Sequence, residues 1–196
     1  MSKLAFIFPG QGAQKAGMGK DFYENSEAAR SFFDQAQKIL DFDLKEMCFG
    51  EHEELNLTEY TQPCMVSVCL AIVQELKKRG INPDITAGLS LGEYAAVAAA
   101  GGMNELDAIK LVRRRGILMQ STVPAGEGAM AAVLGLDAKK IEEILESFEN
   151  VWIANYNCPG QIVITGLTNE VQQASLALKE AGAKRVVELK VSGPFH

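Results

Sequence analysis

Long apolar segments are missing from this sequence of 196 residues, although 47% of the residues are hydrophobic. No apolar run reaches the length of about 20 residues that a membrane-spanning helix needs. The first residues lead directly into an expected strand, without a charged segment followed by a long apolar one, so no secretory signal is expected. We therefore expect a cytoplasmic protein that can bury a core in one or two domains.

A strong excess of one charge is also missing. The 19 basic and 25 acidic residues give a net charge of −6 and form no run of like charge. This balance argues against nucleic acid as a partner, and no basic amphipathic helix indicates a membrane surface. Repeats and low-complexity segments are absent as well, which leaves an ordinary globular protein.

Cysteine and histidine are both scarce. The four cysteines form no CxxC pair and no metal-ligand spacing, which predicts reduced, buried thiols and no bound metal. Only two histidines are available as a general base. His52 lies in an acidic polar loop, where a solvated side chain is expected, whereas His196 directly follows an expected strand that can hold a side chain rigidly. The cysteines are Cys48, Cys64, Cys69 and Cys158.

Strand and helix patterns alternate in the first part of the chain. The continuous apolar run at residues 4–8 predicts a strand buried on both faces. Thr61 is expected to cap a helix that has Pro63 in its first turn. The alternation predicts an α/β layer structure with a largely parallel sheet. The expected strands cover residues 4–8 and 85–87, and the expected helices cover 27–40, 61–78, 93–100 and 105–120, with a polar stretch between 41 and 59.

The pattern changes after the Pro-Ala-Gly turn at residues 124–126. Helices capped by Asp137 and Asn169 are expected among four strands, in the order βαββαβ that is typical of a ferredoxin-like small domain. We expect this small domain at residues 127–191, inserted into a large domain that covers 1–126 and resumes at 192–196. The four expected strands cover residues 129–134, 151–156, 161–165 and 185–191.

Ser90 stands in Gly-Leu-Ser-Leu-Gly at residues 88–92, which has the spacing of a nucleophile elbow. Glycine-flanked serines also occur in ordinary loops, but the expected strand before it and the helix-forming segment after it favour the elbow. The flanking glycines would let strand and helix approach closely. Because a serine hydroxyl is a poor nucleophile without a base, His196 is its expected partner.

Two backbone N–H groups are expected to face the oxyanion of an elbow enzyme. One belongs to the residue after the nucleophile, here Leu91. The other comes from a separate loop at the end of a strand, and Gln11 between Gly10 and Gly12 is well placed to supply it.

Arg115 is expected on the inner face of its helix, because Ala108, Val112 and Met119 recur around it at helical spacing. Arg113 and Arg114 then fall on the opposite side, where solvated side chains are expected. An unpaired charge is costly in an apolar interior. Arg115 therefore either forms an internal salt bridge or receives a substrate carboxylate, which its planar fork binds bidentately.

Five linked motifs resemble the malonyl-CoA:acyl carrier protein transacylase family over the entire chain. The resemblance implies an α/β-hydrolase-like large domain with a ferredoxin-like insertion, and transfer of a malonyl group from coenzyme A to the thiol of acyl carrier protein in fatty acid biosynthesis, with no metal or redox cofactor. It implies Ser90 as acyl acceptor, His196 as base, Arg115 as carboxylate ligand, Gln11 and Leu91 as oxyanion hole, and Gln62 and Phe195 as substrate-binding residues. The motifs lie at residues 9–14, 61–63, 88–94, 115–116 and 193–196.

The sequence departs from the family pattern in two places. Leu89 precedes the nucleophile where the family usually has histidine, and the sequence stops at His196 where the family continues. The resemblance thus implies a missing C-terminal segment of the same fold. A serine esterase or thioesterase of the same elbow class and a catalytically silent fragment are the alternatives. An acidic carrier protein would need a local basic patch, for which Lys184, Arg185 and Lys190 are the candidates.

Overall fold

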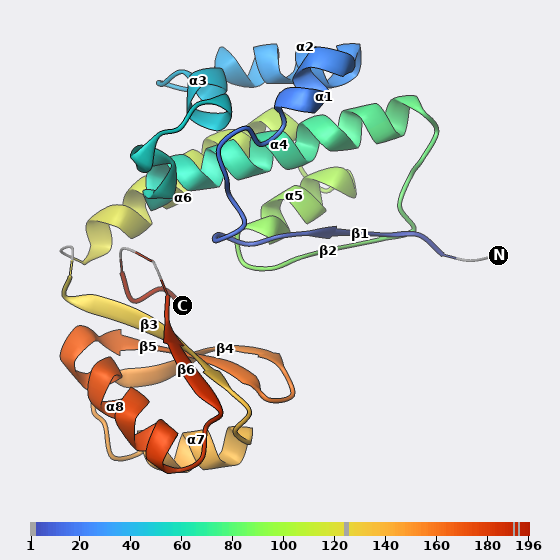
Figure 1. Cartoon of the computed structure of the whole chain (residues 1–196). Helices are drawn as coiled ribbons and strands as arrows, with labels where there is room; N and C mark the ends of the chain where they lie inside the picture. The colour runs from blue at the N-terminus through green and yellow to red at the C-terminus, as the bar shows by residue number, and fades with distance from the viewer. Residues whose placement is uncertain (1–2, 124–125, 190, 192) are drawn as a thin grey trace. The chain divides into compact units, whose positions relative to one another are not determined.

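The computed structural model describes residues 3–123, 126–189, 191 and 193–196. These residues form a mixed α/β structure that divides into two compact units, residues 1–118 and 119–196 (Figure 1). The division falls inside helix α6, Glu105–Thr122, and thus earlier along the chain than the expected boundary at residue 126.

The sheet of the first unit consists of strands β1, Ala5–Phe8, and β2, Ile85–Gly88. They pair in parallel with Ala5 opposite Ile85 and Phe8 opposite Gly88. Because the carboxyl ends of parallel strands lie at one edge of a sheet, the loop after β1 and the turn after β2 meet there. The expected parallel pairing is therefore present at the two loops that matter for the site.

Helices supply most of the core of the first unit. The longest is α4, which packs against α2 and α5, and α5 lies between α4 and the two strands (Figure 1). The buried cluster draws on α2, α4, α5 and α6 together with Phe8. The helices are α1, Lys20–Asn25; α2, Glu27–Gln37; α3, Leu44–Phe49; the 3-10 helix η1, Glu53–Asn56; α4, Thr58–Lys78; α5, Gly92–Ala99; and α6.

Helix α3 lies in the segment that the sequence analysis described only as a polar stretch. Asp43 caps it by accepting a hydrogen bond from the Glu46 N–H at 3.0 Å. Leu44 and Cys48, one turn apart on the same face, are fully buried. Two apolar residues at this spacing are enough to fix one short helix once α4 provides a surface for them.

The start of α4 also differs from the prediction. The helix begins at Thr58, and Thr61 lies inside it, where its hydroxyl donates to the Leu57 carbonyl at 3.0 Å and to the Leu55 carbonyl at 2.6 Å. Thr61 is therefore not the cap. Pro63 lies in the helix interior, and because proline has no N–H, it cannot donate to the carbonyl of Glu59 four residues earlier.

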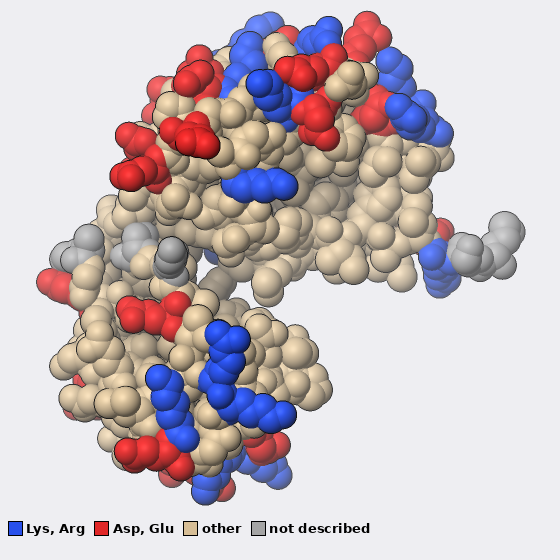
Figure 2. Space-filling model, in the orientation of Figure 1, with Lys and Arg blue, Asp and Glu red and all other residues tan. Residues whose placement is uncertain are grey.

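The prediction that β1 is buried on both faces is wrong. Phe8 is buried and Phe6 packs on the core, but the intervening Ile7 is 78% exposed, and Ile85 on β2 is 53% exposed. Side chains alternate between the faces of a strand, and the described helices α4 and α5 cover only one of them. An apolar groove of about 420 Å³ runs between β1 and α4, and Figure 2 shows mainly uncharged surface between these two elements.

The second unit is a four-stranded antiparallel sheet in the order β4-β5-β3-β6. Its elements follow the predicted order βαββαβ, and α7 and α8 pack on one face of the sheet. They are β3, Gly128–Leu134; α7, Ala138–Leu145; β4, Val151–Cys158; β5, Gln161–Leu167; α8, Thr168–Glu180; and β6, Arg185–Glu188.

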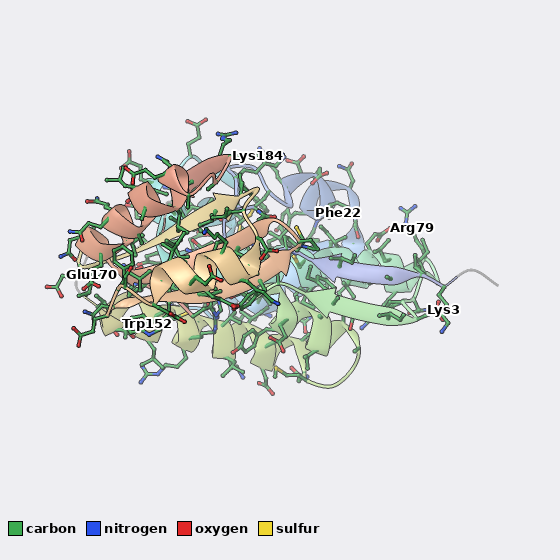
Figure 3. All side chains as sticks on the ribbon, turned by 90° about the horizontal axis from the view of Figure 1, so that it is seen from below. Lys3, Phe22, Arg79, Trp152, Glu170 and Lys184 are labelled. Atoms are coloured by element: carbon green, nitrogen blue, oxygen red, sulfur yellow. The ribbon has the colours of Figure 1, made fainter. Side chains whose placement is uncertain are left out.

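The two predicted caps of the second unit have different outcomes. Asp137 caps α7 by accepting a hydrogen bond from the Lys139 N–H at 3.0 Å. Asn169 does not cap α8, because the helix already begins at Thr168, whose hydroxyl donates to the Gly126 carbonyl at 2.7 Å. Glu170, which Figure 3 labels, lies in the first turn of α8. It accepts two hydrogen bonds from Asn150, at 3.0 and 2.8 Å, and so links the start of β4 to this helix.

Two further expectations concern the chain as a whole. In the described part of the chain, no helix has the length and apolar character needed to cross a membrane. Cys48 and Cys64 are buried and Cys69 is half-buried, as free thiols, but Cys158 near the β4–β5 turn is exposed, which corrects the expectation of four buried thiols. Cys158 is the last residue of β4, and the residues at this end of the strand are exposed.

Candidate active site

Ser90 occupies a strained turn between β2 and α5. Its φ of 50° lies in the left-handed region, which costs a residue with a side chain about 1–2 kcal/mol. The strand ends at Gly88 and the helix begins at Gly92, so the strand–turn–helix context predicted from the sequence is present. A serine held in this conformation at the end of a parallel strand is the geometry of a nucleophile elbow.

Glycines make this turn possible by removing side chains where backbones meet. A Cβ on Gly88 would overlap the backbone of Gly92, and a Cβ on Gly92 would overlap the Phe8 carbonyl and lie 2.7 Å from the Pro9 carbonyl oxygen. A Cβ on Gly10 would lie 2.9 Å from the Leu89 carbonyl oxygen. Strand and helix thus approach closely at the flanking glycines, as predicted, and the elbow also packs backbone against backbone on the loop after β1.

Arg115 on α6 reaches the serine. Its Nη2 donates a hydrogen bond to Ser90 Oγ at 3.3 Å, and its guanidinium carbon lies 5.6 Å from the centre of the Tyr94 ring. Among the described residues it forms no ion pair with a carboxylate. The internal salt bridge that the sequence left open is therefore not seen in this part of the chain, and the role of Arg115 in receiving a substrate carboxylate stays a prediction.

The loop after β1 is attached to the start of α4. Gln11 Nε2 donates to the Thr58 hydroxyl at 3.1 Å, and the Gly12 N–H donates to Gln14 Oε1 at 2.7 Å. Leu91 is buried immediately before the first residue of α5. Within the described part of the chain, neither the Gln11 N–H nor the Leu91 N–H donates to a backbone carbonyl. Both donors thus lie in the loops beside the elbow without a backbone acceptor of their own.

Three other polar side chains of the first unit, discussed in the sequence analysis, are buried or bound to neighbouring residues. Gln62 is 1% exposed within α4, so its role in contacting substrate stays a prediction. His52 is not simply solvated, since its Nε2 lies 3.0 Å from Glu46 Oε1. Arg113 is not solvated either: its side chain is 13% exposed and forms ion pairs with Asp41 and Glu59. The sequence alone contains no signal that pairs Arg113 with Asp41, which lies 72 residues earlier.

Phe195 and His196 belong to the second unit. Phe195 packs on the sheet face opposite α7 and α8, against Met130 and Val163. Pro194 closely approaches Gly128 at the start of β3, where a Cβ would overlap the proline ring. The segment that carries His196 is therefore held against β3 within its own unit, and His196 itself is exposed.

Other nucleophiles and metal ligands do not gather in the described residues. No group of three or more His, Cys, Asp or Glu side chains is placed there to hold a metal ion. Burial raises the pKa of the Cys69 thiol to about 11, and a contact with the Cys48 thiol together with burial raises the pKa of Cys64. Because the reactive form of a cysteine is its thiolate, these thiols are poor nucleophiles.

Comparison with known proteins shows the family of this chain. The family model described as acyl transferase domain matches residues 5–195. The chain belongs to the acyl transferase domain family. This acyl transferase domain is 50% identical to the malonyl CoA-acyl carrier protein transacylase of Bacillus subtilis strain 168 and 47% identical to that of Staphylococcus aureus strain MSSA476. Each match covers 100% of this chain, and 63% and 65% of the relatives.

Solved structures give the same relationship. The malonyl CoA-acyl carrier protein transacylase of Clostridium perfringens superposes with a TM-score of 0.93 at 44% identity, covering 100% of this chain and 63% of that one. A type II polyketide acyl-carrier protein in complex with its malonyl-transacylase includes a chain that superposes with a TM-score of 0.93 at 40% identity, covering 98% of this chain and 64% of that one. The chain described here thus spans slightly under two thirds of the length of these relatives.

Proposed function

We propose that this acyl transferase domain transfers a malonyl group from coenzyme A to the phosphopantetheine thiol of acyl carrier protein through a malonyl ester on Ser90. The observation that carries the proposal is the hydrogen bond from Arg115 to Ser90 Oγ at 3.3 Å, at a strained elbow in a member of the acyl transferase family. We further propose that the first unit is the α/β-hydrolase-like part of the fold and the second a ferredoxin-like insertion.

The first half-reaction forms a bond between Ser90 Oγ and the thioester carbonyl carbon. His196 takes the hydroxyl proton, and the oxyanion is received by the N–H groups of Gln11 and Leu91. The start of α5 adds a favourable partial positive charge near the same atom. The carbon–sulfur bond then breaks, the sulfur of coenzyme A takes the proton back from His196, and a malonyl ester remains on Ser90.

The second half-reaction is the reverse with a different thiol. The phosphopantetheine sulfur gives its proton to His196 and attacks the ester, and Ser90 regains a proton as it leaves. A thiolate is a good leaving group, so a serine and histidine pair is sufficient. No step changes an oxidation state, and the proposal therefore needs no redox cofactor.

Arg115 supplies the selectivity for malonyl groups. The free carboxylate of a malonyl ester lies a few bonds from the ester carbon, and a guanidinium within hydrogen-bond distance of Ser90 Oγ can bind it bidentately. Phe195 is proposed as a further substrate-binding residue. For the carrier protein, Lys184 and Arg185 are exposed, and Figure 2 shows basic side chains over the region of β6; Lys190 lies outside the described residues.

Intact mass after incubation with malonyl-CoA tests the proposal. We expect stoichiometric malonylation that persists without a thiol acceptor and is discharged by the phosphopantetheine-bearing carrier protein. Ser90→Ala is the matched control and should acquire no label. Rapid hydrolysis of the acyl-enzyme would instead indicate a thioesterase, and a malonylated Ser90→Ala variant would overturn the assignment of the nucleophile.

A further inference from the structure

Arg113 lies at the centre of a polar and aromatic cluster that joins α6 to the start of α4. Its Nε and Nη2 each lie 2.9 Å from a carboxylate oxygen of Asp41, which is a bidentate contact. Its guanidinium carbon lies 4.9 Å from the centre of the Tyr60 ring and 5.3 Å from that of the Phe42 ring. Arginine rather than lysine suits such a site, because only its planar group can fork and stack at once.

The Arg113 side chain also supplies a hydrogen-bond donor that α4 lacks. Pro63 leaves the carbonyl of Glu59 without its helical donor, and a buried carbonyl without a partner is costly. Arg113 Nη1 donates to that carbonyl at 2.9 Å and to the Glu59 carboxylate at 3.0 Å. Helix α6 is therefore attached to the backbone of α4 at the one carbonyl that the proline sets free.

This attachment lies within one helical turn of the residue that reaches the serine. Gly116 approaches the backbone of α4 so closely that a Cβ there would lie 2.8 Å from the Thr58 carbonyl oxygen and 2.8 Å from the Glu59 Cα. Arg115 lies between Arg113 and Gly116 in sequence. The contacts of both neighbours with the Thr58–Glu59 backbone therefore fix the position of α6 along its axis, and its rotation about that axis, at Arg115. In the described part of the chain, the Arg115 guanidinium contacts Ser90 Oγ and the Tyr94 ring but forms no ion pair that would hold it.

We propose that Arg113 is a positioning residue for recognition of the malonyl carboxylate: it fixes α6 on the start of α4 and thereby sets the distance between Arg115 and Ser90. The inference rests on the proposed malonyl transfer. A displacement of about 1 Å in a binding group can change a rate up to about a hundredfold. Loss of the Arg113 contacts should therefore reduce preference for malonyl over acetyl groups, because acetyl has no carboxylate for Arg115 to meet.

The test compares acylation of Ser90 by malonyl-CoA and by acetyl-CoA in matched variants of the protein. Arg113→Met keeps an unbranched apolar stem and removes all the polar contacts of the side chain, and Arg113→Lys keeps the charge. Arg114→Met is the control, since Arg114 is the exposed neighbour on the same helix. We expect the ratio of kcat/KM for malonyl-CoA over acetyl-CoA to fall roughly tenfold or more in Arg113→Met, less in Arg113→Lys, and not at all in Arg114→Met.

A double variant separates positioning from general loss of stability. If Arg113 acts through Arg115, then Arg113→Met should have no further effect on the malonyl-to-acetyl ratio in an Arg115→Ala background. A variant that merely unfolds part of the enzyme lowers both rates equally, which active-site titration corrects. An unchanged ratio in correctly titrated Arg113→Met, or an equal drop in both backgrounds, would overturn the inference. Absence of malonyl transfer in the unmodified protein would overturn the proposed function instead.

Discussion

Replacing Gly92 by alanine should destabilise the first unit, although local preferences predict the opposite. Gly92 is the first residue of α5, where alanine is favoured over glycine by about 0.8–1.0 kcal/mol. The new Cβ, however, would overlap the Phe8 carbonyl and lie 2.7 Å from the Pro9 carbonyl oxygen. Both obstacles are backbone atoms at the end of β1, which cannot rotate away as a side chain can.

The size of the effect follows from these two contributions. Overpacking typically costs about 1–3 kcal/mol, and contact with two backbone carbonyls places this case at the upper end. After the gain in helix preference, we expect a net loss of about 2 kcal/mol in the free energy of unfolding, out of about 5–15 kcal/mol for a typical domain. Separation of α5 from β1 would also move the Leu91 N–H away from the Gln11 loop, so malonylation should fall as well.

Urea unfolding followed by circular dichroism measures the loss, and Gly80→Ala provides the control. Gly80 has a positive φ of 75° with open space around its missing side chain, so alanine there carries only the backbone cost of about 1–2 kcal/mol. We expect a lower midpoint for Gly92→Ala than for Gly80→Ala. A Gly92→Ala variant as stable as the unmodified protein, or more stable, would refute the close packing of elbow and loop.

Three further outcomes are expected. Arg115→Ala should weaken malonyl transfer by about 2–5 kcal/mol in transition-state terms while sparing acetyl transfer, and equal loss of both in steady-state kinetics would assign Arg115 a structural role. An alkylating reagent at neutral pH should label Cys158 first and the three other thiols only after denaturation, since these are buried or half-buried; mass spectrometry of peptides decides this. Arg113 holds the pKa of Asp41 below its ordinary value of 3.8, chiefly through their hydrogen bonds. The contribution of Asp41 to stability is therefore present above that value and lost as the pH falls through the folded pKa, so the stability difference from Asp41→Asn should shrink with acidification in a pH series of unfolding curves.

Sequence patterns predicted the elements that have strong local signals. The elbow is the clearest case, because two glycines, a short strand and a helix-forming segment all lie within a few residues of Ser90. The capping role of Asp137 and the element order of the second unit were accessible for the same reason. In each case the deciding sequence signal lies in residues that are close along the chain.

The errors concern contacts between residues that are far apart along the chain. The exposure of Ile7 depends on which elements cover the sheet, and an apolar run does not contain that information. Arg113 was assigned to solvent from its position on the helix, yet its partner Asp41 lies 72 residues earlier. Pro63 did carry information. A proline inside a helix predicts that the carbonyl four residues earlier needs another hydrogen-bond donor, although the sequence does not show which residue supplies it.

If Ser90 is the nucleophile as proposed, its left-handed backbone means that stability and activity favour different residues at this position. Glycine adopts a φ of 50° without strain, and asparagine tolerates it better than serine does. In a saturation library screened only for protease resistance or abundance, glycine and asparagine should be enriched at position 90. In the same library screened for growth that depends on acyl transfer, serine alone should persist. A lineage released from the need for this reaction would be expected to lose its serine early, while the rest of the elbow, held by backbone packing, stayed intact.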